Sequence, residues 1–316
     1  MAKVGRSTRY RRPFSAVVGA LAATGLLLSL AGCSSGSDDD GSGGAPDRAG
    51  GRVTKPSSPA PRPTPAWRTD PASIAALGDS ITVGFDACGV LSECPEVSWS
   101  TGTDPAVDSL ARRLVKNPAT HSWNLAQTGA VMADLPAQVD RAVARRPELV
   151  TVLIGANDAC RPTTAAMTPA ADFRTTFEAS MRKLRRALPK TQVYVAGVPD
   201  LMRLWSEGRE NPLGKQVWKL GICASMLRDP DDLSKAAADR RQSVQDRVTA
   251  YNAALRDVCR KDTLCRFDRA VSDYRFTTGE LSAWDWFHPS KEGQRELAGL
   301  AYKEITRREE PVTGVG

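Results

Sequence analysis

The sequence is short of the residues that typically build metal sites and nucleic-acid interfaces. It has only two histidines, and none of its seven cysteines forms a C-x-x-C pair, which disfavours a zinc site. Its formal charge of +7 overstates its basic character, because residues 1–33 hold five Lys or Arg and no Asp or Glu. Beyond residue 33, the remaining 38 of the 43 basic residues face all 36 acidic ones, so we expect no nucleic-acid partner.

The first 33 residues have the features of an export signal. Basic residues precede an apolar stretch from Ala16 to Leu30, which is too short to span a membrane comfortably. The stretch ends in Leu-Ala-Gly-Cys at Leu30–Cys33, which is similar to a bacterial lipobox, in which the cysteine is lipidated after cleavage before it. An ordinary signal peptide with a chance cysteine is the alternative. The pair Arg11-Arg12 also resembles a twin-arginine signal, so the export route stays open.

Residues 34–66 are predicted to be a tether. They are rich in Ser, Gly, Asp, Pro and Arg, and they nearly lack large apolar residues, so they cannot bury enough surface to offset their ordering entropy. They would act as a spacer that holds a domain off a membrane, or simply as a disordered leader. The rest of the folded chain, residues 67–310, is long enough for one core and shows no repeat or second linker.

The cysteine count also fits an exported chain. If Cys33 carries lipid, six cysteines remain, and an even number in an exported protein is typical of disulfides. Six cysteines allow about 15 connectivities, so the pairing is open from the sequence alone. We predict local pairs where the cysteines are close in sequence, which leaves one long-range pair: Cys88–Cys94, Cys259–Cys265 and Cys160–Cys223.

Apolar runs alternate with amphipathic stretches, which favours an α/β fold with a parallel sheet. Strands are expected at Ser73–Leu77, Ser122–Ala126, Leu149–Ile154, Gln192–Gly197 and, from a weaker pattern, Leu264–Phe267. Helices are expected from the Asp104-Pro105 cap to about Lys116, over Asp134–Arg145 and Ala170–Leu188, from Leu233 to about Cys259, and from Ser290 to Arg307. Residues Met202–Asp232 fit no regular element. They are expected either as an insertion over a cleft, and so a possible lid, or as a long surface loop pinned by a disulfide.

A serine follows the first of these apolar runs. Ser80 lies in Gly78-Asp79-Ser80-Ile81-Thr82, directly after Ile74–Leu77. A buried strand that ends in this way delivers the serine to the carboxyl edge of a parallel sheet, where ligands bind in such folds. Gly-Asp-Ser is also an ordinary turn sequence, so the tripeptide alone is weak evidence. Thr82 stands where a G-x-S-x-G elbow requires glycine, which argues against the α/β-hydrolase family.

Further motifs follow in a fixed order along the chain: Gly129, then Gly155-Ala156-Asn157-Asp158, then Asp285-Trp286-Phe287-His288-Pro289. Together with Ser80, this set resembles the SGNH subgroup of the GDSL hydrolases over about residues 72–305. The resemblance implies a three-layer α/β/α sandwich with a five-stranded parallel sheet, of the flavodoxin-like kind. It also implies that Ser80, Gly129, Asn157 and His288 carry the family's chemistry.

The residue types agree with a serine nucleophile. A serine hydroxyl needs a base to take its proton, and the base needs a partner that orients it. Only His121 and His288 could serve as the base. Asp285 precedes His288 by three residues and can reach its Nδ1 atom, whereas His121 has no close carboxylate in sequence and is expected at the surface. The alternative, a purely structural turn histidine at 288, is disfavoured by the other motifs.

Charge that develops on a carbonyl oxygen must be met by fixed hydrogen-bond donors. The backbone N–H groups of Ser80 and Gly129 and the side-chain amide of Asn157 are the candidates for such an oxyanion hole. Asp79 and Asp158 are expected to shape loops rather than to act as acids. Aromatic residues around the histidine could wall an apolar acyl pocket or pack in the core: Trp284, Trp286 and Phe287.

We therefore expect an exported serine hydrolase that cleaves carboxylic esters, of lipase or esterase type, through a Ser80-His288-Asp285 triad and an acyl-enzyme. It should be a monomer without metal or cofactor, anchored by Cys33 at the outer face of a bacterial cytoplasmic membrane or simply secreted. Its partners would be a small-molecule or lipid ester and the membrane. A carbohydrate acetylesterase on the same fold and a non-catalytic cell-surface binding protein are the alternatives.

Overall fold

The computed structural model describes residues 67–307. The predicted signal peptide, the lipidation site Cys33 and the predicted tether lie outside the described residues. Within 67–307, no helix is both long and apolar enough to cross a membrane.

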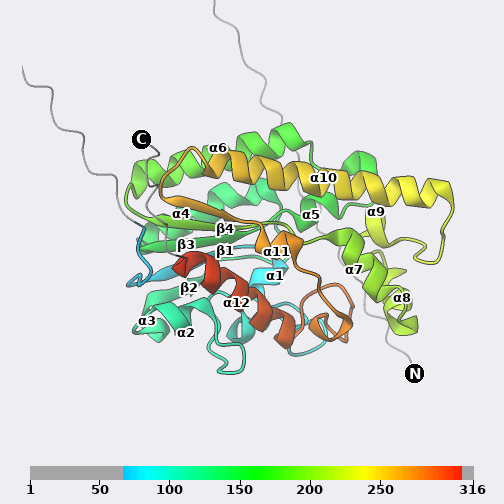
Figure 1. The fold of residues 1–316 in the computed structure, drawn as a ribbon, viewed down its shortest axis with the longest axis horizontal. Coiled ribbons are helices and arrows are strands. Elements are labelled where there is room, and N and C mark those ends of the chain that lie inside the picture. Colours follow the sequence, from blue (N-terminus) through cyan, green and yellow to red (C-terminus); the bar gives the residue numbers. More distant parts are fainter. Residues whose placement is uncertain (1–66, 308–316) are drawn as a thin grey trace, which may run out of the picture. The chain divides into compact units, whose positions relative to one another are not determined.

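A parallel sheet of five strands forms the centre of the fold, in the order β2-β1-β3-β4-β5 (Figure 1). The expected strands are all present, with bounds shifted by one or two residues: β1 Ile74–Gly78, β2 Ser122–Asn124, β3 Leu149–Leu153, β4 Gln192–Ala196 and β5 Cys265–Asp268. Ile74 of β1 pairs with Ser122 of β2 on one side and with Leu149 of β3 on the other. This is the doubly wound flavodoxin-like order, in which ligands bind where the winding reverses, between β1 and β3.

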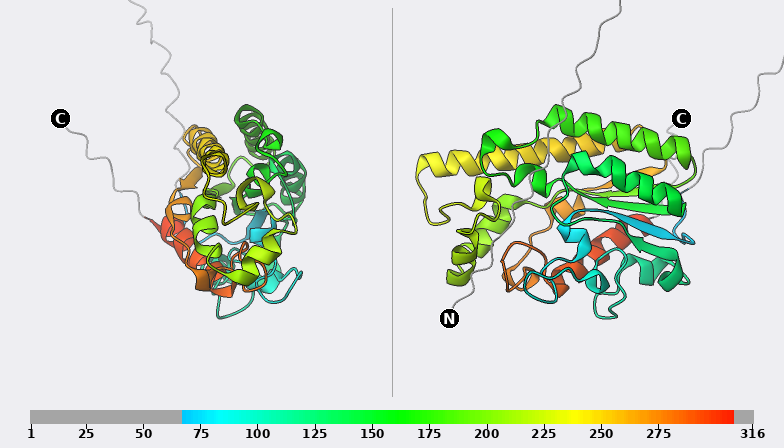
Figure 2. Two further views of the ribbon diagram at one scale, coloured as in Figure 1. Left: turned by 90° about the vertical axis from the view of Figure 1, so that its right-hand side faces the viewer. Right: turned by 180° about the vertical axis from the view of Figure 1, so that it is seen from behind.

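Helices cover both faces of this sheet, so the expected three-layer α/β/α sandwich is confirmed (Figures 1 and 2). One layer holds α4 (Leu135–Arg145), α6 (Ala170–Ala187) and α10 (Lys235–Cys259), and the other holds α2 (Leu110–Leu114), α3 (Pro118–His121) and α12 (Lys291–Thr306). Single-turn helices lie in the connections: α1 (Ser80–Val83), α5 (Ala156–Ala159), α11 (Ala270–Asp273), and the 3-10 turns Pro95–Val97, Met132–Asp134, Thr164–Ala166 and Thr278–Glu280.

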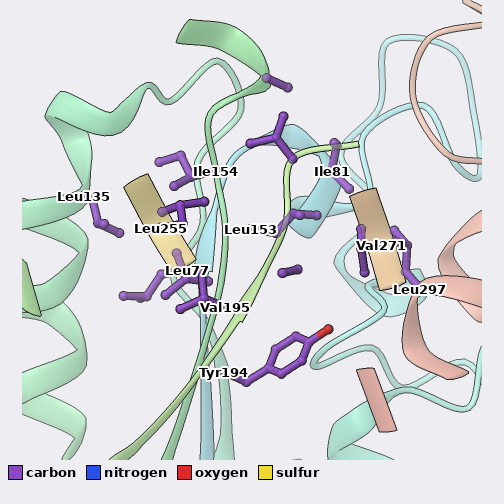
Figure 3. Packing of buried hydrophobic residues seen from close by; sticks show 14 of the residues in the cluster. Leu77, Ile81, Leu135, Leu153, Ile154, Tyr194, Val195, Leu255, Val271 and Leu297 are labelled. Atoms are coloured by element: carbon purple, nitrogen blue, oxygen red, sulfur yellow. The ribbon is translucent and has the colours of Figure 1, made fainter. Parts of the chain in front are cut away.

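Every residue of β1, β3 and β4 is buried, as expected for strands covered on both faces. Figure 3 shows Leu135 and Leu255 on one side of the strands and Val271 and Leu297 on the other. The core therefore consists of two apolar layers separated by the sheet.

The chain enters and leaves the described domain at the same place. The indole N–H of Trp67 donates to the carbonyl of Ile305, near the end of α12, at 2.8 Å. The next residue, Arg68, donates its backbone N–H to the side chain of Gln192, the first residue of β4, at 3.0 Å. Both ends of the domain thus lie at the amino edge of the sheet, opposite the edge to which β1 delivers Ser80.

The helix expected from Asp104-Pro105 to Lys116 is wrong in its first half. The Asp104 carboxylate accepts from the backbone N–H of Ala106 in a local turn, and Asp108 has φ +50°, which a right-handed helix cannot contain. Helix α2 begins only after Ser109, whose hydroxyl caps it. Aspartate adopts the left-handed region more readily than most residues, but it does so too rarely for Asp108 to be recognised from the sequence.

The segment Met202–Asp232 is helical, contrary to the expectation that it fits no regular element. It contains α7 (Leu201–Gly208), α8 (Pro212–Trp218) and α9 (Ala224–Leu227). Asp200 caps α7, and Asn211 caps α8 with proline at the first helical position. These capping residues can be recognised in the sequence, but each helix is too short for its apolar periodicity to be detected. We call residues 201–232 the insertion; Figure 1 shows α7 and α8 beyond the carboxyl ends of the strands.

Three disulfides link the same cysteine pairs that the sequence favoured: Cys88–Cys94, Cys160–Cys223 and Cys259–Cys265. The first and third close short local loops. The second joins α5 to the insertion across 63 positions of sequence, so it is the long-range link of the fold.

Candidate active site

The candidate nucleophile lies at the point where β1 ends. Asp79 follows the strand and caps α1, accepting from the backbone N–H of Ile81 at 3.0 Å, so that Ser80 becomes the first residue of that helix. Gly78, before it, has φ +152°, and a Cβ there would lie 2.3 Å from the carbonyl oxygen of Leu153 in β3. Only glycine fits this close approach, and the turn carries Ser80 to the carboxyl edge of the sheet.

His288 and Asp285 meet this serine from the other end of the sequence. The Nε2 atom of His288 lies 2.8 Å from Ser80 Oγ, and its Nδ1 atom lies 2.5 Å from Asp285 Oδ2. Ser80 and Asp285 are both nearly inaccessible to solvent. The structure therefore brings together the three residues that the sequence singled out, in the connectivity that a proton transfer from serine to imidazole requires.

The loop around the histidine is held by its own carboxylate. Asp285 Oδ1 accepts from the backbone N–H groups of Phe287 and His288 at 2.9 and 3.0 Å. Burial acts to raise the pKa of Asp285, but the hydrogen bond and the positive charge of His288, together with these backbone bonds, outweigh it and hold the pKa below its usual value. The carboxylate is thus charged and fixed in place at neutral pH, as an orienting partner must be.

Candidate oxyanion donors lie at the same edge of the sheet as Ser80. The backbone N–H groups of Ser80 and Gly129 have no acceptor among residues 67–307. The side-chain amide of Asn157, in α5, donates to the carbonyl of Ala130 at 3.0 Å, which ties it to the Gly129 loop and leaves its second hydrogen for a ligand. Gly129 has φ +79°. These donors lie in the connections that follow β1, β2 and β3, three neighbouring strands of the sheet.

The two aspartates expected to shape loops do so. Asp79 caps α1, and Asp158 accepts from the backbone N–H of Met132 at 2.8 Å. Burial raises the pKa of Asp79 to about 7. His121 lies at the end of α3, exposed, with its Nδ1 atom 2.8 Å from the hydroxyl of Thr120, and it takes no part in the site.

Sequence reasoning missed the part played by the insertion. The indole N–H of Trp218 in α8 donates to the backbone carbonyl of Asp285 at 2.9 Å, and the Trp218 side chain is fully buried. Trp286 has φ +50°, a strained conformation for a bulky residue, and it packs against Gly214 of α8, where a Cβ would lie 3.0 Å from its ring. The glycines at 208 and 214 are the signal that could have shown it, since each makes room for one of these indoles.

A comparison with models of protein families identifies the family of this chain. A model of the GDSL-like lipase/acylhydrolase family matches residues 76–296, which is more than half of the chain. The chain belongs to the GDSL-like lipase/acylhydrolase family. A search of curated proteins found no match.

Solved structures with a similar fold have low sequence identity to this GDSL-like hydrolase. They include TesA (16% identity, 74% of this chain and 98% of that chain, TM-score 0.46). An extracellular lipase from Streptomyces rimosus shares 18% identity over 74% of this chain and 99% of that chain, with a TM-score of 0.43. A family 3 carbohydrate esterase from Clostridium thermocellum shares 14% identity over 74% of this chain and 94% of that chain, with a TM-score of 0.44.

The GDSL-like hydrolase has an apolar pocket beside Ser80. Neighbours in sequence of Ser80, Asn157 and His288 line one wall, namely Ile81, Ala156 and Phe287. Side chains of the insertion, including Leu201 and Leu204, line another. The aromatic residues around the histidine thus have different positions: Phe287 lines the pocket, Trp286 packs against α8, and Trp284 is half exposed at the surface.

Proposed function

We propose that this ester hydrolase acts as a serine esterase through Ser80, His288 and Asp285. The observation that carries the proposal is the continuous hydrogen-bonded chain from Ser80 Oγ through the imidazole to the Asp285 carboxylate. In this mechanism Ser80 Oγ attacks the ester carbonyl while its proton passes to His288 Nε2. The same proton then passes to the leaving alcohol as the C–O bond breaks and an acyl-enzyme remains.

Water completes the reaction in the reverse sense. His288 takes a proton from water, the resulting hydroxide attacks the acyl carbon, and the proton returns to Ser80 Oγ as the acid leaves. In both steps the negative charge on the carbonyl oxygen faces the N–H groups of Ser80 and Gly129 and the amide of Asn157. Loss of one such donor typically lowers kcat by about 10²–10³-fold.

We propose further that the substrate has an apolar acyl group. The pocket beside Ser80 is lined almost entirely by aliphatic and aromatic side chains, which favours an apolar acyl group.

The test begins with a fluorophosphonate probe and a series of aryl esters from acetyl to palmitoyl, with an acetylated glycan alongside. We expect the probe to label Ser80 and Ser80→Ala to abolish both labelling and hydrolysis while the protein stays folded. Activity retained in Ser80→Ala would refute the mechanism, and absence of both labelling and turnover in the wild type would support a non-catalytic binding protein.

A matched pair of variants tests the acyl pocket. Leu204 lines the pocket, whereas Leu213, in α8, is 66% exposed and does not. Leu204→Gln should lower kcat/KM for octanoyl esters several-fold more than for acetyl esters, because each buried CH₂ contributes about 0.8 kcal/mol. Leu213→Gln should leave the ratio unchanged. An equal loss on both esters in Leu204→Gln would show that the acyl chain binds elsewhere.

We also propose that the chain is exported and anchored through lipid on Cys33. The lipobox-like sequence at Leu30–Cys33 and the polar stretch after it support this proposal. Stable anchoring takes two or more acyl chains, which a lipidated amino-terminal cysteine would supply. Cys33→Ser should release the protein from the membrane fraction or block its maturation. A wild-type protein found free in the medium, beginning downstream of Cys33, would show instead that the chain is simply secreted.

A further inference from the structure

A second buried carboxyl group lies against the proposed triad, and the mechanism above does not use it. Asp86 follows Ser80 by six positions and is 3% exposed. Its carboxyl group, the carboxyl group of Asp285 and the imidazole of His288 each place an oxygen or nitrogen atom within 4.8 Å of the others. Two carboxyl groups that face each other in a buried site cannot both carry full charge without cost, so one proton is expected between them.

The loop that carries Asp86 holds this carboxyl group in place. Asp86 has φ +56°, a conformation that aspartate tolerates better than most residues. Its backbone N–H donates to the carbonyl of Ser92 at 2.9 Å, and the N–H of Ser92 donates to Asp86 Oδ1 at 3.3 Å. The Cys88–Cys94 disulfide closes the same loop, and the hydroxyl of Ser282 donates to the Asp86 carbonyl at 2.7 Å.

The pKa of Asp86 is determined by its burial and by its nearest neighbours, Asp285, His288 and Ser92. Burial, followed by the negative charge and the proximity of the Asp285 carboxyl group, raises the pKa of Asp86 to about 6. A protonated His288 and the N–H of Ser92 act in the opposite sense. Asp86 therefore changes its charge in the pH range in which a catalytic histidine works.

We propose that Asp86 is a positioning residue of the catalytic assembly, which shares a proton with Asp285 and places a second negative charge beside His288 once that proton has left for solvent. The proposal rests on the triad mechanism proposed above. While Asp86 is protonated, its O–H donates to the Asp285 carboxylate. Once it is ionised, its charge favours the imidazolium that forms when His288 takes the proton of Ser80.

This role predicts a particular change in Asp86→Asn, which keeps the shape and a donor but cannot ionise. The acid limb of the kcat/KM profile should move to lower pH by roughly half to one pH unit, because the imidazolium loses a stabilising charge. At the plateau, kcat should fall about 3- to 10-fold because His288 becomes a weaker base. A residue that merely supports the fold would lower activity at every pH without moving the limb.

Glu96→Gln is the matched control. Glu96 lies just after Cys94, is exposed, and loses the same single charge without lying against the triad. Its pH profile should match that of the wild type. Fluorophosphonate labelling of wild-type Ser80 is tested first. If labelling fails, the triad mechanism is wrong. If labelling succeeds and the acid limb of the Asp86→Asn profile does not move, only the proposed role of Asp86 is wrong.

Proton NMR of the imidazoles gives a second readout that does not depend on turnover. The chain has only two histidines, and His121 is exposed and remote from the site, so it serves as an internal reference. In the Ser80→Ala background, the midpoint of the His288 titration should fall when Asp86→Asn is added, while that of His121 stays fixed.

The same spectra keep the proposal testable if Asp86→Asn does not fold. With Asp86 intact and Asp79 replaced by asparagine, the His288 curve should be broadened or show two steps, because Asp86, Asp285 and His288 titrate as a coupled unit. The Asp79→Asn change is needed because the charge of Asp79 also interacts with His288. A single-step His288 curve of the same shape as that of His121 would overturn the proposal, as would an unchanged His288 midpoint in a folded Asp86→Asn variant.

Discussion

Removal of the Cys160–Cys223 disulfide should destabilise this domain about twice as much as removal of either local disulfide. The loss of chain entropy in the unfolded state grows with the length of the loop that a disulfide closes. Cys160–Cys223 spans 63 positions, and Cys88–Cys94 and Cys259–Cys265 span 6 each. The loop-entropy relation gives about 4.3 kcal/mol for the long loop and about 2.4 kcal/mol for each short one.

The assay compares two double variants that remove the same number of sulfur atoms. Cys160→Ala/Cys223→Ala and Cys259→Ala/Cys265→Ala are unfolded in urea and by heat, starting from the oxidised protein. For a domain of this size, the first should lose about 9–17 °C in Tm and the second about 5–10 °C. Equal losses in the two variants would refute the reasoning, because the difference rests only on loop length.

The same variant has a functional consequence. The disulfide joins α5, which carries Asn157, to the insertion that holds the Asp285 loop through Trp218. The hydroxyl of Ser225 reinforces the junction by donating to the Ala159 carbonyl at 2.8 Å. Loss of the disulfide should therefore lower kcat more than it raises KM, since Asn157 and Asp285 lose a common support. An unchanged kcat in the folded variant would show that the insertion is not needed to align them.

Three further outcomes are expected. His288→Ala should lower kcat by several orders of magnitude and His121→Ala should change it by less than about twofold, as ester hydrolysis by the purified variants will show; the reverse order would refute the triad. Trp218→Phe removes one buried hydrogen bond and part of an indole, so it should lower the free energy of unfolding by roughly 1–3 kcal/mol. It should also reduce kcat with little change in KM. A larger effect on KM would show that Trp218 acts on substrate binding in the pocket instead. Because burial raises the pKa of Asp79 to about 7 in the folded state, it contributes a loss of stability as pH rises from about 4 to 7. In Asp79→Asn the loss should be smaller in urea unfolding followed across pH, with the part that Asp86 contributes remaining, and an unchanged slope would contradict the raised pKa.

The sheet and the meeting of Ser80, His288 and Asp285 could be predicted from the sequence because their signals are local or ordered along the chain. The runs that became β1, β3 and β4 are apolar throughout, as strands buried on both faces must be. Asp285 and His288 are close in sequence, and Ser80 directly follows a strand, so few residues had to be placed to expect their meeting.

The sequence could not show what depends on contacts between distant segments. Asp86 reads as a loop residue before a cysteine, and only the fold brings its carboxyl group to Asp285, some 200 positions away. Trp218 reads as one aromatic in an irregular stretch, and only the fold places its N–H on the Asp285 carbonyl. The false helix start at Asp104 has the same origin, because the left-handed conformation of Asp108 is imposed by its surroundings.

The meeting of the two domain ends at the Trp67–Ile305 contact has a practical consequence for handling the enzyme. A resin, dye or fusion partner joined at either end would sit at the amino edge of the sheet, separated from Ser80 by the length of β1, about 17 Å for its five residues. Immobilised in this way, the enzyme would have the carboxyl edge of the sheet, which carries Ser80, facing the solution rather than the support. For the same reason a short linker could join the two ends directly, and a circular permutant opened in a surface loop far from that edge should keep its active site intact.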